Sequence, residues 1–192
     1  MLAPTTLKTL SIDESLAHAD DGAAFVDLRP IESYLDVHIL ASLALLYEFG
    51  PGMSARARDC LPLDLPLMLL HTAEARMANA AAALRGKGFS VLGMVEDGIN
   101  EWAGRRGSPA STELTDASDP PDGTLLDVGD PGARRPEGAL RIPIEKLWTR
   151  LDEVPDGAPI VVVAGYGVRA ALAVGMLERA GVGEVIVWRR RS

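Results

Sequence analysis

The stretch VVVAGYGVRAALAVGMLERAG, residues 161–181, decides the fold. It begins with a β-branched apolar run, which is typical of a strand covered on both faces, and ends with an Ala-rich segment of helical periodicity. Between the two lies a glycine loop that runs from Ala164 to Arg169. Strand, loop and helix in this order predict one βα unit of an α/β protein with a parallel sheet.

A similar unit occurs in the first half of the chain. The segment LPLMLLHTAEARMANAAAALRGKGF (65–89) matches APIVVVAGYGVRAALAVGMLERAGV (158–182) in its proline, its apolar strand, its loop ending in arginine and its Ala-rich helix. Each unit follows an earlier strand that ends in aspartate, Asp27 or Asp127. The repeat predicts strands near 23–28, 66–71, 124–128 and 159–164, with helices starting near Glu74 and Gly167.

The repeat predicts two α/β domains in tandem, each a parallel sheet flanked by helices. The segment SPASTELTDASDPPDG (108–123) has the Ser, Thr, Asp and Pro content of a linker. We therefore expect a first domain over 1–109, a linker over 110–122 and a shortened second domain over 123–192.

Composition excludes several classes of protein. A net charge of −8 argues against nucleic-acid or anionic-membrane partners. One cysteine excludes an internal disulfide, and the three histidines form no recognisable metal pattern, so neither a metal nor a cofactor is expected. Without a signal-peptide start or an apolar run of about 20 residues, a cytoplasmic location is expected. The sequence leaves open whether the chain forms a homodimer.

The order of these motifs resembles the rhodanese-like domain family, and it covers nearly the whole chain. The matching pieces are Leu125 to Val128, Pro136 to Pro143 and Pro159 to Gly181 in the second half, and Val26 to Arg29, Glu32, Tyr34, His38-Ile39 and Leu67 to Phe89 in the first. The arrangement is also similar to the paired rhodanese domains that follow a metallo-β-lactamase-like domain in some bacterial persulfide-handling proteins. The resemblance implies sulfur transfer in active members, through a cysteine at the first position of the loop.

Neither loop of this chain has that cysteine. His71 stands at the first position of the loop in the first half, and Ala164 stands there in the second. Cys60 lies before the strand predicted near 66–71, and no neighbour in the sequence would activate its thiol. We therefore expect no catalytic residue and a pseudoenzyme: a binding or regulatory module linked to sulfur metabolism, whose partner is an unknown protein or a small anion. The alternative implied by the resemblance is a sulfurtransferase that uses thiosulfate or a persulfide.

The two loops differ in their expected affinity for anions. The second-half loop, with Gly165, Tyr166, Gly167, Val168 and Arg169, is expected to hold sulfate or phosphate weakly through its amides at a helix N-terminus. The first-half loop, with His71, Thr72, Ala73, Glu74, Ala75 and Arg76, is expected to repel anions because Glu74 is acidic. The loop-ending arginines are expected to bind loop carbonyls, and Asp27 and Asp127 to brace the turns that follow them.

The glycine loop has one further interpretation. Gly165-x-Gly167-x-x-Ala170, placed between a strand and a helix, also fits a dinucleotide-binding fingerprint. Against it, the fingerprint usually opens a domain, and the first-half loop contains no glycine. A dinucleotide-binding protein therefore remains the weaker alternative.

Overall fold

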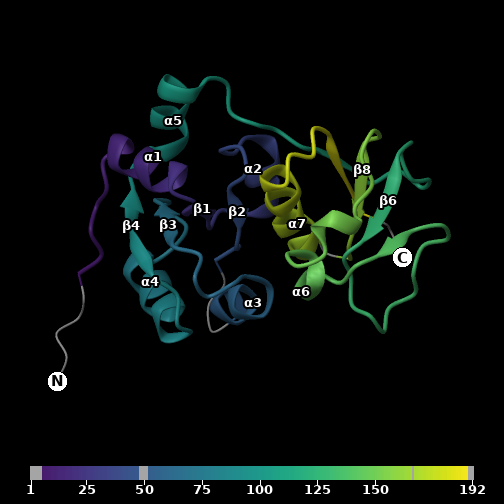
Figure 1. Cartoon of the computed structure of the whole chain (residues 1–192), viewed down its shortest axis with the longest axis horizontal. Coiled ribbons are helices and arrows are strands. Elements are labelled where there is room, and N and C mark those ends of the chain that lie inside the picture. The colour runs from purple at the N-terminus through teal and green to yellow at the C-terminus, as the bar shows by residue number, and fades with distance from the viewer. Residues whose placement is uncertain (1–5, 48–51, 166, 190–192) are drawn as a thin grey trace.

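The computed structural model describes residues 6–47, 52–165 and 167–189, and it contains two parallel sheets flanked by helices (Figure 1). This confirms the predicted α/β class. The first half contains α1 (Ile12–Asp20), β1 (Ala24–Asp27), α2 (Ile31–Asp36), β2 (Leu43–Ala44), α3 (Gly52–Cys60), β3 (Leu67–Leu70), α4 (Met77–Gly86), β4 (Val91–Val95) and α5 (Gly98–Arg106). The second contains β5 (Glu113–Thr115), β6 (Thr124–Asp127), β7 (Leu140–Arg141), α6 (Ile144–Leu147), η1 (Leu151–Glu153), β8 (Ile160–Val163), α7 (Val168–Arg179) and β9 (Val185–Trp188).

The two sheets share one strand order. The first runs β2-β1-β3-β4 and the second β7-β6-β8-β9-β5, with every neighbouring pair parallel. The four strands expected from the repeat are β1, β3, β6 and β8. Helix α7 starts beside Gly167 as expected, whereas α4 starts at Met77, later than expected, because a turn from Thr72 to Ala75 precedes it.

The segment expected to be a linker carries a strand. Within residues 110–122, β5 pairs with β9 in the register Glu113 to Ile186 and Thr115 to Trp188. The first sheet has a similar feature, because Thr9 forms a parallel bridge to Met94 at the outer side of β4. Each sheet therefore receives a short edge segment from the chain that precedes its first long strand.

Helix α7 lies between the two halves (Figure 1). It is buried from Ala170 to Leu177, and it approaches the loop before β2 so closely that a Cβ at Gly175 would lie 2.0 Å from the Ser42 carbonyl oxygen. One hydrophobic cluster extends through α7 from the inner face of the first sheet to that of the second. The halves therefore share a core.

Polar contacts tie the end of α7 to the first half. The Glu178 carboxylate accepts a hydrogen bond from the Ala41 amide at 2.7 Å and lies 3.0 Å from His38 Nε2. His38 is fully buried, and its Nδ1 lies 2.8 Å from the Tyr34 carbonyl oxygen. These contacts satisfy buried polar groups at the junction of the two halves.

The outer faces of the two sheets are covered differently. In the first half, α1 and α5 pack on a cluster that includes Phe25, Met68 and Val95. In the second half, the corresponding small cluster contains Val161, Val163, Ile186 and Trp188, and no helix follows β9 in the described part of the chain. Among the described residues, no helix is both long and apolar enough to cross a bilayer.

Candidate functional site

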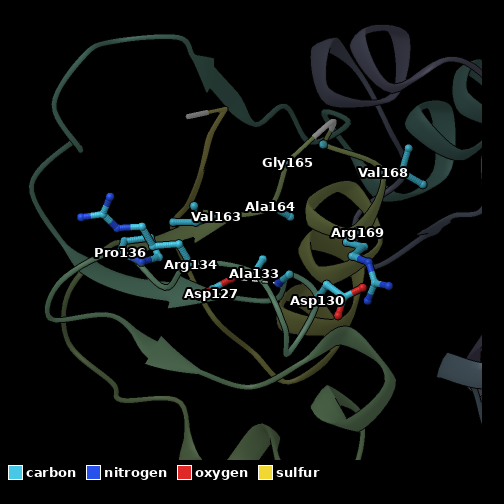
Figure 2. A pocket seen from close by; sticks show the side chains of 12 residues that line it. Asp127, Asp130, Ala133, Arg134, Pro136, Val163, Ala164, Gly165, Val168 and Arg169 are labelled. Carbon is cyan, nitrogen blue, oxygen red and sulfur yellow. Dashed lines mark hydrogen bonds between the residues drawn. The ribbon is translucent and has the colours of Figure 1, made fainter. Parts of the chain in front are cut away.

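Two cavities lie at the carboxyl ends of the strands, one in each half. The larger, about 800 Å³ in volume, is lined by Asp127, Gly129, Asp130, Ala133, Arg134, Pro136, Val163, Ala164, Gly165, Gly167, Val168 and Arg169 (Figure 2). The smaller, about 320 Å³, is lined by Asp27, Arg29, Val37, Leu70, His71, Asp97, Gly98, Ile99, Asn100 and Pro109. Ligands of open α/β sheets bind at this edge. The predicted positions His71 and Ala164 thus line equivalent cavities, one in each sheet.

The start of α5 explains why the first cavity is smaller. Asp97, the N-cap residue of α5, and Gly98, Ile99 and Asn100 in its first turn form one wall of that cavity. The second half has no corresponding helix among its described residues. Its cavity is bounded instead by the loop over 129–136.

A buried aspartate braces each cavity. The Asp27 carboxylate accepts hydrogen bonds from the Arg29 amide at 3.0 Å and from its guanidinium at 2.7–3.1 Å. The Asp127 carboxylate accepts from the Gly129 amide at 2.9 Å and from the Arg141 guanidinium at 2.7 and 3.0 Å. Both aspartates therefore brace the turns that follow their strands, as the sequence predicted.

The guanidinium comes from a different position in each half. In the first half it belongs to Arg29, and Ala44 stands opposite Asp27 in the strand register. In the second half Arg141 stands opposite Asp127. Gly129 follows Asp127-Val128 where Arg29 follows Asp27-Leu28, and the neighbouring strand supplies the arginine instead. In the sequence, this partner of Asp127 is the arginine of ALRIPI, Arg141.

The loop after β8 leads directly into α7. Gly167 has a φ of +86°, its amide donates to the Ala164 carbonyl oxygen at 3.2 Å, and none of the described side chains caps the helix. The amides of Val168 and Arg169 have no hydrogen-bond acceptor among the described residues. Two first-turn donors therefore remain at the positive end of a helix. Tyr166, also expected in this site, lies outside the described residues.

Among the described residues, neither loop-ending arginine binds a loop carbonyl, contrary to the expectation. The Arg169 guanidinium donates to the Glu145 carboxylate of α6 at 2.5 Å. Arg76 is exposed and has no hydrogen-bond or ion-pair partner among the described residues. Both α6 and α7 pack in the shared core, so the second loop is anchored through Arg169 to a neighbouring helix.

The first-half loop contributes only its first residue to a cavity. His71 is exposed and lines the smaller cavity, whereas none of Thr72 to Arg76 does. The Thr72 hydroxyl accepts from the Glu74 amide and donates to the Glu74 carboxylate, both at 3.3 Å. Glu74 thus lies beside its own loop, exposed to solvent and outside the smaller cavity, although it was expected to repel anions from this loop.

Cys60 lies away from both cavities. It is buried at the end of α3, and burial, helped by the nearby carboxylate of Glu145, raises the pKa of its thiol to about 12. A thiol with such a pKa carries almost no thiolate at neutral pH, and the thiolate is the nucleophile. The described residues also contain no cluster of three or more His, Cys, Asp or Glu side chains suited to a metal ion.

Comparison with known proteins finds similar folds. No family model matches the chain, and no curated protein does. Similar solved structures include a thiosulfate sulfurtransferase from Pseudomonas aeruginosa, with 17% identity over 95% of this chain and 41% of that one, at a TM-score of 0.44. A 3-mercaptopyruvate sulfotransferase from Escherichia coli, described as having the rhodanese fold, has 19% identity over 96% of this chain and 98% of that one, at 0.41.

A single-domain sulfurtransferase from Saccharomyces cerevisiae matches 55% of this chain with 96% of its own, at 20% identity and a TM-score of 0.40. All three of these structures are described as sulfurtransferases or a sulfotransferase, and the description of the Escherichia coli one names the rhodanese fold. The chain spans less than half the length of the Pseudomonas protein. At these identities the likeness concerns the fold alone.

Proposed function

We propose that this chain is a non-catalytic rhodanese-like protein that binds a small anion or a protein partner in sulfur metabolism. One observation carries the proposal: the cavities contain His71 and Ala164 where sulfur transfer would need a thiol, and the only cysteine is buried elsewhere. Binding needs no nucleophile. The amides of Val168 and Arg169, which have no acceptor among the described residues, supply donors to an anion in the larger cavity.

The test is sulfur transfer from thiosulfate to cyanide by the full chain. We expect no thiocyanate above the uncatalysed background and, by mass spectrometry, no persulfide on Cys60, because its raised pKa leaves the sulfur unreactive. Turnover by the unmodified chain would refute the proposal. It would instead support the alternative, a sulfurtransferase that uses thiosulfate or a persulfide.

A repaired variant provides the matched comparison. In the Ala164→Cys, Cys60→Ser variant, the new thiol lies beside the first turn of α7, whose positive end lowers its pKa below the ~8.5 of a free cysteine. We expect faster alkylation of this thiol than of Cys60 in the unmodified chain, and a persulfide after exposure to thiosulfate. An inert thiol would show that the loop does not stabilise an anion.

The weaker alternative, a dinucleotide bound through Gly165 and Gly167, is tested separately. A thermal-shift series with NAD, NADP, sulfate and phosphate distinguishes it, since a dinucleotide site stabilises the fold with the dinucleotides far more than with the inorganic anions.

A further inference from the structure

We propose that the larger cavity binds an organic carboxylate with an apolar body, and not merely a small inorganic anion. The proposal rests on the proposed function, because it assumes binding without covalent chemistry at Ala164. The ligand class follows from three features of the cavity: its apolar lining, its charges and its preformed wall.

The lining is mostly apolar and too extensive for an inorganic anion. Five side chains, those of Ala133, Pro136, Val163, Ala164 and Val168, and three glycines account for most of the lining residues. The volume of about 800 Å³ lies within the ~300–1,000 Å³ of small-molecule pockets. A sulfate ion would leave most of this apolar surface in water, whereas an aromatic or branched body would cover it.

The charges of the lining favour a carboxylate. The buried Asp127 carboxylate is matched by the Arg141 guanidinium at 2.7 Å, so it does not oppose a bound anion. Arg134 has no hydrogen-bond or ion-pair partner in the described part of the chain, and Figure 2 shows its side chain extending outward past Pro136, on the opposite side of the cavity from Arg169. A free guanidinium at the rim of an apolar cavity matches a carboxylate in geometry and charge.

Asp130 is the remaining carboxylate of the lining, and it is exposed. Its side chain accepts a hydrogen bond from the Gly132 amide at 3.2 Å, and Figure 2 places it on the Arg169 side, away from Arg134. The Arg134 side therefore has the excess positive charge. We infer that the carboxylate group of an organic ligand lies there, across the cavity from the Val168 and Arg169 amides proposed to bind an inorganic anion. Its apolar body extends over Val163 and Ala164.

The wall of the cavity is preformed. The Arg141 guanidinium that pairs with Asp127 also donates to the carbonyl oxygens of Pro131 at 3.0 Å and Ala133 at 2.8 Å. These bonds fix the loop that presents Ala133 and Arg134. A preformed wall lowers the ordering cost of binding a ligand.

The experiment is calorimetric titration of the full chain with three probes: 1-naphthoate, its uncharged analogue 1-naphthamide, and sulfate. We expect naphthoate to bind most tightly, and naphthamide about tenfold more weakly, since it lacks the charge that Arg134 pairs with. Arg134→Gln should reduce naphthoate affinity about tenfold and leave naphthamide unchanged. Arg135→Gln is the matched control, because Arg135 is exposed and adjacent but does not line the cavity.

A second variant tests the apolar part of the site. Ala133→Phe places a ring into the cavity from an exposed position, so it should weaken both naphthalene probes without impairing the fold. Equal binding of naphthoate and naphthamide, or equal effects of Arg134→Gln and Arg135→Gln, would overturn the proposed ligand class. Sulfate binding without naphthoate binding would also overturn it while leaving the proposed function intact. Sulfur transfer by the unmodified chain would refute the proposed function, whatever the probes show.

Discussion

At the scale of single residues, the two cavities have the same ion pair built in two ways. Both pairs join a buried carboxylate at the end of a strand to a guanidinium, and the two groups lie 2.7 Å apart in each. In the first half the arginine is Arg29, two residues after the aspartate, whereas in the second half it is Arg141, on the adjacent strand. A buried carboxylate without a cationic partner destabilises the fold. The fold therefore requires a guanidinium beside each aspartate, but not an arginine at one particular position in the sequence.

The first prediction concerns Arg141. Arg141→Ala leaves the Asp127 carboxylate buried without its cation, so the free energy of unfolding should fall by about 2–4 kcal/mol, as measured by urea denaturation. Adding Gly129→Arg to that variant should restore part of the loss, because it recreates the arrangement of Arg29. Failure of the second substitution to restore any stability would contradict the equivalence. Arg150→Ala, in an exposed ion pair, is the control and should change stability little.

At the scale of elements, sequence reasoning predicted ranges for β1, β3, β6 and β8, but not for β4 and β9 or for the short strands β2, β5 and β7. The apolar runs that became β1, β3, β6 and β8 have strong signals, because strands buried on both faces need continuous apolar residues. Strand β5 lies in a Ser-, Thr- and Asp-rich segment, and its three residues are identified only by pairing with β9. Such pairing is a long-range contact that local composition does not encode.

The candidate site was predicted in the same uneven way. The first loop positions, His71 and Ala164, each line a cavity, because the shared strand-loop-helix pattern puts both at the carboxyl end of a strand; their role in a site stays a prediction. The contribution of Arg134 and Arg141 was not predicted. Both act from a loop and a strand whose proximity to Ala164 depends on the folded sheet, and residue spacing alone does not show it.

Two helical glycines test the packing of an element. Gly175 in α7 faces the Ser42 carbonyl, and a Cβ there would lie 2.0 Å from that oxygen; around Gly104 in α5 there is nothing within 4 Å. Alanine favours helices over glycine by about 0.8–1.0 kcal/mol. We therefore expect Gly104→Ala to be neutral or stabilising and Gly175→Ala to destabilise by about 1–3 kcal/mol, because α7 must shift from the loop before β2. Stabilisation by both substitutions in thermal denaturation would refute this close packing.

At the scale of the whole molecule, α7 belongs to both halves. It leaves the loop of the larger cavity at Val168, runs buried through the common core, and ends where Glu178 binds the first half. The strands form two separate sheets, but buried residues of both halves belong to one hydrophobic cluster. For this reason we expect the two halves to unfold cooperatively. A single transition is therefore expected when the chain unfolds.

Replacing Glu178 tests that cooperativity. Glu178→Ala removes the acceptor of the Ala41 amide and the partner of buried His38, so both halves should lose about 2 kcal/mol of stability together. Tryptophan fluorescence reports each half separately, through Trp102 in the first and Trp188 in the second, in variants that keep only one of them and carry phenylalanine at the other tryptophan positions.

We expect the two reporters to give the same urea midpoint before the substitution and the same, lower midpoint after it. Glu184→Ala is the control, since Glu184 is exposed in the loop before β9, and it should leave both midpoints in place. Two separate midpoints in the unmodified chain, or a shift confined to Trp188, would mean that the halves unfold independently. In that case the shared core would contribute little to stability, and the contact between Glu178 and the first half would serve only to orient the two sheets.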